Sequence, residues 1–176
     1  MKRREKVLSR IKFRRFSTVQ LLVGVDVFLI GALFVEEIEG GDVIVLDLIY
    51  INQPLYFVTF AARDRRRIRS LDGARLAIER YSHRGIAKFS VALGRYIIMP
   101  DHVHLFVRGG PDFTLSSWVG GLKRAMSVAV KSPRLWQPGF FDHILRSDES
   151  YADKWNYFRD NPVRAGLVQT ADDWPY

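Results

Sequence analysis

The stretch from Met99 to Val107 constrains the fold more than any other part of the chain. It reads Met-Pro-Asp-His-Val-His-Leu-Phe-Val and holds two of the four histidines. Alternation of apolar residues with the histidines is typical of a β-strand. Because residues i and i+2 of a strand lie on one face, we expect His102 and His104 side by side and Val103 in the core. Two adjacent imidazoles suit a divalent cation better than a core, so the strand predicts a metal site, with a structural pair as the alternative.

A helix near the C-terminus carries a second pair of functional candidates. Asp148 or Ser150 is expected to cap its start, and Pro162 to stop it, because the residue before a proline is pushed out of the helical region. Tyr157 and Asn161 are four residues apart, which would place them on one helix face with Cβ atoms roughly 5–6 Å apart. A phenol and an amide on one face near the His-x-His strand would suit a nucleophile and a third metal ligand. The alternative is that Tyr157 packs and Asn161 caps the helix end.

Three motifs in order resemble a known family. Residues 99–105 resemble the His-hydrophobic-His signature of the IS200/IS605-type single-tyrosine transposases. Residues 135–146, with a tryptophan, an aromatic pair and Asp-His-x-x-Arg, resemble the REP-associated tyrosine transposase branch. Residues 157–168, which begin Tyr-Phe-Arg-Asp-Asn-Pro, resemble the tyrosine helix of the same branch. The similarity extends from about Gln53 to Trp174.

The resemblance implies a mechanism. Tyr157 would attack a single DNA strand and form a 5′-phosphotyrosine link, so that cleavage and rejoining become two steps. His102, His104 and Asn161 would hold Mg²⁺ or Mn²⁺, which polarises the phosphate. The expected function is therefore a single-stranded DNA endonuclease and transposase that acts on hairpin, REP-like DNA in DNA transposition and recombination.

Two other classes of function compete with this interpretation. A domesticated hairpin-binding protein would keep the DNA contacts with little or no cleavage, although the intact His-x-His and Tyr157 argue against complete loss. A metal hydrolase or a replication-initiator relative would share the His-x-His strand. A hydrolase does not need the tyrosine, and an initiator would carry extra domains.

The pattern of apolar residues predicts an α+β fold. Strands are expected over 55–61, 89–99, 102–107 and 140–145, with a turn near Pro100-Asp101. Helices are expected from 63–67 to about Tyr81 and, capped by Thr114, to about Val130. This order gives a central antiparallel sheet with helices packed on it. The resemblance implies a ferredoxin-like arrangement.

Residues 1–52 do not fit the resemblance and are interpreted as an N-terminal extension, with the transposase-like domain over 53–176. The extension is basic at first and then apolar from Val19 to Val35, a run that contains Asp26. At about seventeen residues that run is shorter than the roughly twenty needed to span a bilayer. No small-residue cleavage site follows it, so a secretory signal is not expected. A lineage-specific extension or an upstream start codon would explain it.

The charge and the cysteine content agree with a nucleic-acid enzyme. The net charge is +8 and the isoelectric point near 10.0, which predicts a polyanionic partner. There is no cysteine, so disulfides and thiolate metal sites are excluded and a hard divalent ion is favoured. We expect single-stranded or hairpin DNA as the partner, no small-molecule substrate, no membrane, and a cytoplasmic, nucleoid-associated location. The hairpin sequence, the preferred metal and the choice between monomer and homodimer stay open.

Several residues are candidates for DNA contact, although charge runs are usually solvated faces and His143 has packing as its alternative. They are Arg63, Arg65, Arg66, Arg67, Lys123, Arg124, His143 and Arg146. Trp136, Phe140 and Phe141 are candidates for stacking on unpaired bases, with core packing as the alternative. His83 is expected at the surface near a helix end.

Overall fold

The computed structural model describes residues 53–146 and 151–176 of the protein. Within them lies a four-stranded antiparallel sheet in the order β2-β3-β1-β4. Its strands are β1 (Tyr56–Ala61), β2 (Val91–Ile98), β3 (His102–Gly109) and β4 (Phe141–Ile144). The helices are α4 (Leu71–Phe89), α5 (Leu115–Ala129), α6 (Tyr151–Arg159) and α7 (Asn161–Arg164), with short 3-10 turns η1 (Arg63–Arg65) and η2 (Ala171–Asp173).

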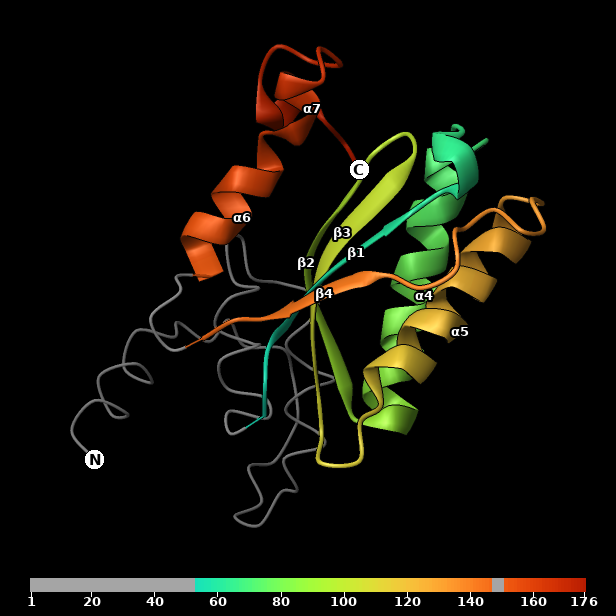
Figure 1. The fold of residues 1–176 in the computed structure, drawn as a ribbon, viewed down its shortest axis with the longest axis vertical. Coiled ribbons are helices and arrows are strands. Elements are labelled where there is room, and N and C mark those ends of the chain that lie inside the picture. Colours follow the sequence, from blue (N-terminus) through green and yellow to red (C-terminus); the bar gives the residue numbers. More distant parts are fainter. Residues whose placement is uncertain (1–52, 147–150) are drawn as a thin grey trace, which may run out of the picture.

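Two crossover connections place the helices. The segments β1-α4-β2 and β3-α5-β4 each skip one strand, and right-handed crossovers put both helices on one face of the sheet. Figure 1 shows α4 and α5 packed on that face, with α6 on the opposite side of the strands. This is the predicted α+β, ferredoxin-like architecture, and it leaves the second face for α6 and the residues beside it.

Strand alternation sorts the side chains between the two faces. Phe60 of β1 pairs with Val103 of β3, and both are buried in the cluster beneath α4 and α5. The next pair along the sheet, Thr59 with His104, lies on the other face. The prediction that Val103 points into the core while the two histidines face away from it is therefore confirmed.

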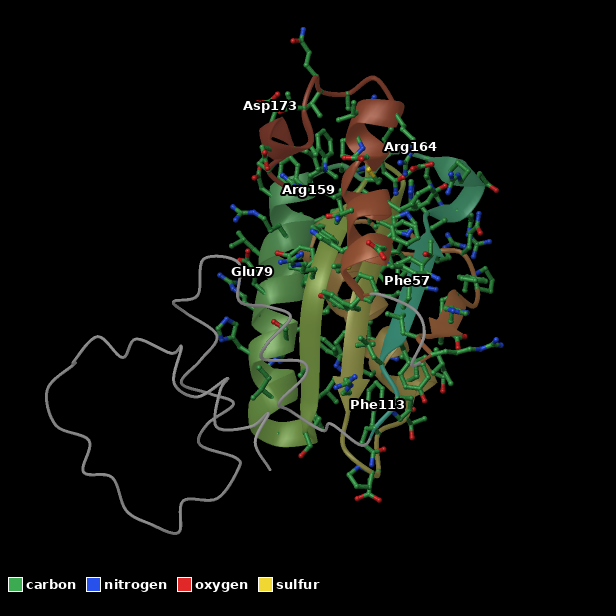
Figure 2. All side chains as sticks on the ribbon, turned by 90° about the vertical axis from the view of Figure 1, so that its left-hand side faces the viewer. Phe57, Glu79, Phe113, Arg159, Arg164 and Asp173 are labelled. Atoms are coloured by element: carbon green, nitrogen blue, oxygen red, sulfur yellow. The ribbon has the colours of Figure 1, made fainter. Side chains whose placement is uncertain are left out.

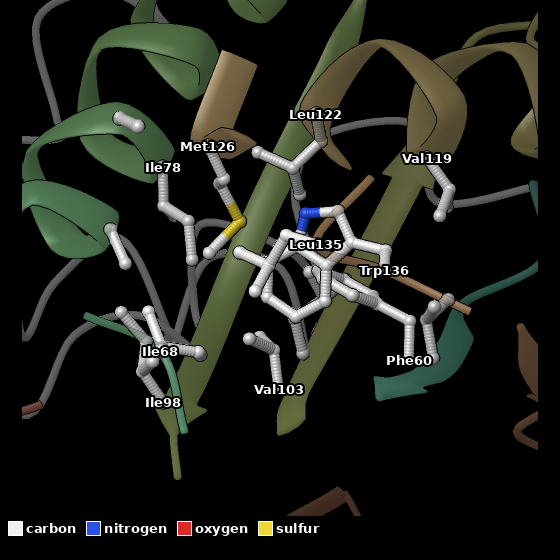
Figure 3. Packing of buried hydrophobic residues seen from close by; sticks show 14 of the residues in the cluster. Phe60, Ile68, Ile78, Ile98, Val103, Val119, Leu122, Met126, Leu135 and Trp136 are labelled. Carbon is white, nitrogen blue, oxygen red and sulfur yellow. The ribbon is translucent and has the colours of Figure 1, made fainter. Parts of the chain in front are cut away.

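The main core lies between the sheet and the helices α4 and α5 (Figure 3). Its largest fully buried side chains include Phe60, Leu122 and Met126. Trp136 meets the Phe60 ring edge-on, with ring centroids 4.8 Å apart. Burial of each such side chain contributes about 1.5–3 kcal/mol, so this core alone holds the sheet rigid behind the opposite face.

The helix after β1 differs from the sequence prediction at both ends. It begins at Leu71 rather than near Arg63, because Ser70 caps it by accepting a hydrogen bond from the Gly73 N–H at 3.0 Å. It continues to Phe89, well past Tyr81, and stops where Ser90 adopts a left-handed conformation. His83 is exposed as expected but lies within the helix rather than near its end.

The tyrosine helix is also shorter than predicted. α6 ends at Arg159, and Asn161 starts the separate helix α7, in which Pro162 occupies the first turn. Proline is well tolerated there because its missing N–H would have no helical partner. The first helix does end before Pro162, as predicted, but the stated reason is wrong, because Asn161, the residue before the proline, is itself helical. Tyr157 and Asn161 therefore do not share one uninterrupted helix. The predicted caps at Asp148 and Ser150, and every interpretation of residues 1–52, lie outside the described residues.

The last residues of the chain return to strand β2. The Ile98 N–H donates to the Tyr176 carbonyl at 2.6 Å, and the Trp174 indole donates to the Ile98 carbonyl at 3.1 Å. An ion pair between Arg159 and Asp172 joins α6 to this C-terminal segment. These contacts fix α7 beside the end of the sheet that carries the histidines. No helix in the described ranges is long and apolar enough to cross a membrane.

Candidate functional site

His102 and His104 form the centre of the face opposite α4 and α5. Their ring centroids are 4.8 Å apart and the ring planes are nearly perpendicular, at 86°. The predicted side-by-side arrangement on one strand face is therefore present. Each ring is held through its Nδ1 atom by an oxygen of a neighbouring side chain.

Asp101 holds His102. Its Oδ1 lies 2.6 Å from His102 Nδ1, and its Oδ2 lies 3.0 Å from Arg65 Nε. Since an ionised carboxylate can only accept, Nδ1 of His102 carries a proton and Nε2 is the ring atom left for a ligand. The carboxylate fixes both the tautomer and the orientation of this imidazole, as carboxylates do behind metal-ligating histidines.

Thr59 holds His104. Its Oγ1 lies 2.7 Å from His104 Nδ1, across the β1–β3 pair. Burial, with smaller contributions from His102, Arg65 and Arg164, lowers the pKa of His104 from 6.5 to about 3. The ring is therefore neutral at physiological pH, and in the tautomer that donates from Nδ1 to the Thr59 hydroxyl it presents an Nε2 lone pair.

Helix α6 lies across this face of the sheet (Figure 2), and an aromatic stack forms between the helix and the histidine pair. Phe158 lies on the Phe57 ring at a centroid distance of 4.2 Å and meets the His104 ring at 4.6 Å. Phe57 also stacks on His104 at 5.6 Å. This apolar wall reduces water access to His104 and fixes the position of α6, so it also sets where Tyr157 stands.

Tyr157 is 63% exposed on α6, and Arg164 of α7 covers its ring. The guanidinium carbon lies 4.3 Å from the ring centroid, and the same group donates to the Tyr157 carbonyl at 2.6 Å and to Asn161 Oδ1. The charge of Arg164 also acts on His104. In the described part of the chain, no hydrogen bond joins Tyr157 or Asn161 directly to the histidine pair. The connection is made through Arg164 and Phe158.

The donor set fits a divalent metal ion. Two imidazoles, each held by an oxygen at Nδ1, leave their Nε2 atoms at adjacent positions of one strand face. Among the described residues no group of three or more histidine, cysteine, aspartate and glutamate side chains gathers. A further protein ligand would therefore come from another residue type, such as the side-chain amide of Asn161, which was predicted from the sequence.

The predicted arginine cluster 63–67 lies at the same end of the sheet as the histidines. Ala61, the last residue of β1, pairs with His102, and the Ala62 N–H donates to the Asp101 carbonyl at 2.7 Å. Asp64 and Arg65 adopt left-handed conformations, with φ of 56° and 52°, at a cost of about 1 kcal/mol each. The turn that they form directs Arg65 onto Asp101, and all four arginines of the cluster are exposed.

The other predicted DNA contacts are distributed differently. Lys123 and Arg124 belong to α5, on the far face of the sheet. Lys123 donates to the carbonyls of Gln137 at 2.6 Å and Gly139 at 2.7 Å, so its ammonium group holds the loop before β4. His143 is half-buried on the face that carries the histidine pair, whereas Arg146 is exposed just beyond the opposite end of the sheet.

Four residues of the site were missed by sequence reasoning. Asp101 and Arg164 lie within the matched motifs, so their positions beside His102 and after Asn161 were a usable signal. Phe158 also lies within a matched motif, directly after Tyr157, whereas Thr59 had no such signal. Their roles depend on contacts across the sheet and between α6 and the sheet.

Comparison with known proteins gives consistent matches. A family model described as "Transposase IS200 like" matches residues 51–149. The "REP-associated tyrosine transposase" of Escherichia coli (strain K12) is 28% identical over 136 residues, which span 72% of this chain and 77% of that protein. The "Putative REP-associated tyrosine transposase" of Haemophilus influenzae is 28% identical over 94 residues, 45% of this chain and 53% of that protein.

A solved structure, "Structure of the REP associates tyrosine transposase bound to a REP hairpin", superimposes with a TM-score of 0.58. It is 26% identical and covers 70% of this chain and 74% of its own. The resemblance inferred from the three motifs is confirmed by these matches.

Proposed function

This chain belongs to the IS200-like transposase family, and we propose that it cleaves and rejoins single-stranded DNA beside a hairpin, with Tyr157 as the nucleophile and a divalent metal ion as cofactor. One observation carries the proposal. His102 and His104 are both held at Nδ1, by Asp101 and Thr59, which leaves both Nε2 atoms for a ligand beside the helix that presents an exposed tyrosine.

The cleavage step follows from the nucleophile. The Tyr157 oxygen forms a bond to phosphorus while the bond from phosphorus to the 3′ oxygen of the neighbouring nucleotide breaks. The products are a 5′-phosphotyrosine link and a free 3′ hydroxyl, after the phenol proton has passed to solvent and the leaving oxygen has gained one. Attack of a 3′ hydroxyl on the link reverses the step and rejoins the strand.

The residues around Tyr157 have separate roles. His102, His104 and Asn161 would hold Mg²⁺ or Mn²⁺, which supplies charge to the scissile phosphate. Arg164 holds the phenol ring and the Asn161 amide in place. Phe57 and Phe158 exclude water from one side of His104, where electrostatic interactions are stronger than in bulk water.

The DNA partner is inferred from charge and from likeness. The exposed arginines of the 63–67 turn border the histidine pair and would bind phosphates, which position a strand without reading its sequence. The solved relative is described as bound to a REP hairpin. We therefore place a hairpin with an adjoining single strand on this face of the sheet.

The test is the covalent adduct. Purified protein is incubated with Mg²⁺ and a labelled hairpin that has a single-stranded flank, and a denaturing gel separates the adduct from free DNA. Tyr157→Phe should abolish the adduct and leave DNA binding nearly unchanged, because phosphate contacts elsewhere supply the affinity.

Tyr151→Phe is the matched control, since it removes another phenol oxygen from the same helix. It should still form the adduct. An adduct that persists in Tyr157→Phe would refute the assignment of Tyr157. Tight hairpin binding by the wild type with no adduct would favour the hairpin-binding alternative.

A further inference from the structure

The structure separates the three aromatic residues that precede or begin β4. Trp136 is only 7% exposed, and its indole donates to the Lys123 carbonyl at 2.9 Å. Phe140 is half-buried and packs against the main core. Phe141 is 62% exposed. Of the three, only Phe141 presents a ring face to a ligand.

Phe141 lies on the same face of the sheet as the histidine pair. It pairs with Thr59 of β1, and Thr59 pairs with His104 of β3, so the three form one row across three strands. Paired residues of an antiparallel sheet point to the same side. Since neighbouring strands lie about 4.8 Å apart, the backbone of Phe141 is about 10 Å from that of His104.

The segment that presents Phe141 is firmly held. The Lys123 ammonium donates to the carbonyls of Gln137 and Gly139, four and two residues before Phe141. The Gln137 N–H donates to the Ala61 carbonyl at 3.0 Å, which ties the same loop to the end of β1. An exposed ring on an anchored segment loses little conformational freedom when a ligand binds, which favours its use as a contact.

We propose that Phe141 is a stacking platform for an unpaired base next to the phosphate that Tyr157 attacks. The inference rests on the proposed function, which places a single strand on this face. Three features favour a base over a protein partner. The apolar surface is a single ring in the row of the histidine pair, the exposed arginines at the same end of the sheet suit a phosphate backbone, and the chain carries a net charge of +8.

The test compares variants of the full chain in DNA binding without metal, measured by fluorescence anisotropy with a labelled hairpin that has a single-stranded flank. Phe141→Leu keeps the apolar volume but removes the aromatic face, and should weaken binding about 5- to 100-fold. Phe141→Trp should bind at least as tightly as the wild type. Phe89→Leu is the matched control, because Phe89 is 63% exposed and lies at the end of α4. It should change nothing.

A second measurement locates the base. A series of hairpins, each lacking one base of the single-stranded flank, is titrated with wild type and Phe141→Leu. The loss caused by Phe141→Leu should disappear on the one DNA that lacks the stacked base and persist on the others. Thermal unfolding of every variant should match the wild type, because both phenylalanines are exposed.

Three results would overturn the proposal. The first is that Phe141→Leu binds DNA as tightly as Phe89→Leu. The second is that the loss of affinity in Phe141→Leu is equal on every base-deleted hairpin. The third is that the wild type is a dimer in sedimentation, and that Phe141→Leu becomes a monomer and loses affinity only as the dimer is lost. The adduct assay separates this from the proposed function. If the wild type forms the adduct but Phe141→Leu does not change DNA binding, only the stacking role of Phe141 is refuted. If Phe141→Leu weakens binding in a base-dependent way but the wild type forms no adduct, only the proposed cleavage activity is refuted.

Discussion

Replacement of Asp101 by asparagine tests whether His102 is a metal ligand that is oriented from behind. The variant keeps the shape of the side chain but removes its charge, so the 2.6 Å contact with His102 Nδ1 becomes a hydrogen bond between neutral groups. Bonds to charged groups contribute about 1.5–3 kcal/mol and neutral ones about 0.5–1.5 kcal/mol. The difference of about 1.4 kcal/mol corresponds to a roughly tenfold weaker affinity for the metal. This agrees with the 10- to 100-fold losses typical of such orienting residues.

The same substitution should lower stability by only about 1–2 kcal/mol, mostly through the weaker bond to His102. Asp101 also pairs with Arg65, but that arginine side chain is 60% exposed, and exposed ion pairs contribute only about 0–1 kcal/mol. Isothermal titration of the DNA-free protein with Mn²⁺ measures the affinity, and thermal unfolding measures stability. Asp112→Asn, at an exposed site beyond the far end of β3, is the matched control, and His102→Ala is the positive control.

One result would refute the reasoning. If His102→Ala abolishes Mn²⁺ binding while Asp101→Asn binds as tightly as the wild type, the carboxylate does not orient the ligand. If neither variant changes the titration, His102 is not a ligand.

Three further predictions concern the histidine face of the sheet and the N-terminal boundary of the domain. Thr59→Val should weaken Mn²⁺ affinity about 10- to 100-fold in the same titration, because it removes the only hydrogen-bond partner of His104 in the described part of the chain, and unchanged affinity would contradict that role. Because burial lowers the pKa of His104 from 6.5 to about 3, its neutral form stabilises the fold fully above pH 6.5, and this stability is lost progressively as pH falls towards 3. Urea unfolding at pH 7 and pH 4 should therefore show a smaller acid loss for His104→Gln than for wild type, and equal losses would contradict the cause. A shortened chain that begins at Ile51 should fold and form the adduct like the full chain, because the described sheet begins at Tyr56, and an insoluble product would move the domain boundary towards the N-terminus.

The parts of the site that the sequence predicted depend on local periodicity. The period of two in β3 was enough to place His102 and His104 on one face. Pro162 indicated a helix boundary, but α6 already ends at Arg159 and the proline lies in the first turn of α7. The start of α4 was predicted wrongly, although the residue that caps the helix is close by in the sequence. The arginines after β1 were taken for the start of a helix, although Ser70 is the residue whose side chain caps it.

Tertiary structure decided how the two histidines are held and what surrounds them. Thr59 lies 45 residues from His104 in the chain, and nothing in its neighbours marks it as the partner of that imidazole. Only the register of β1 against β3 brings them together, just as the register of β4 puts Phe141 in the same row. A sequence pattern carries the period of one element, which sets the face on which a side chain lies. The partner across the sheet depends on strand order and register, which are set by the packing of all the elements together.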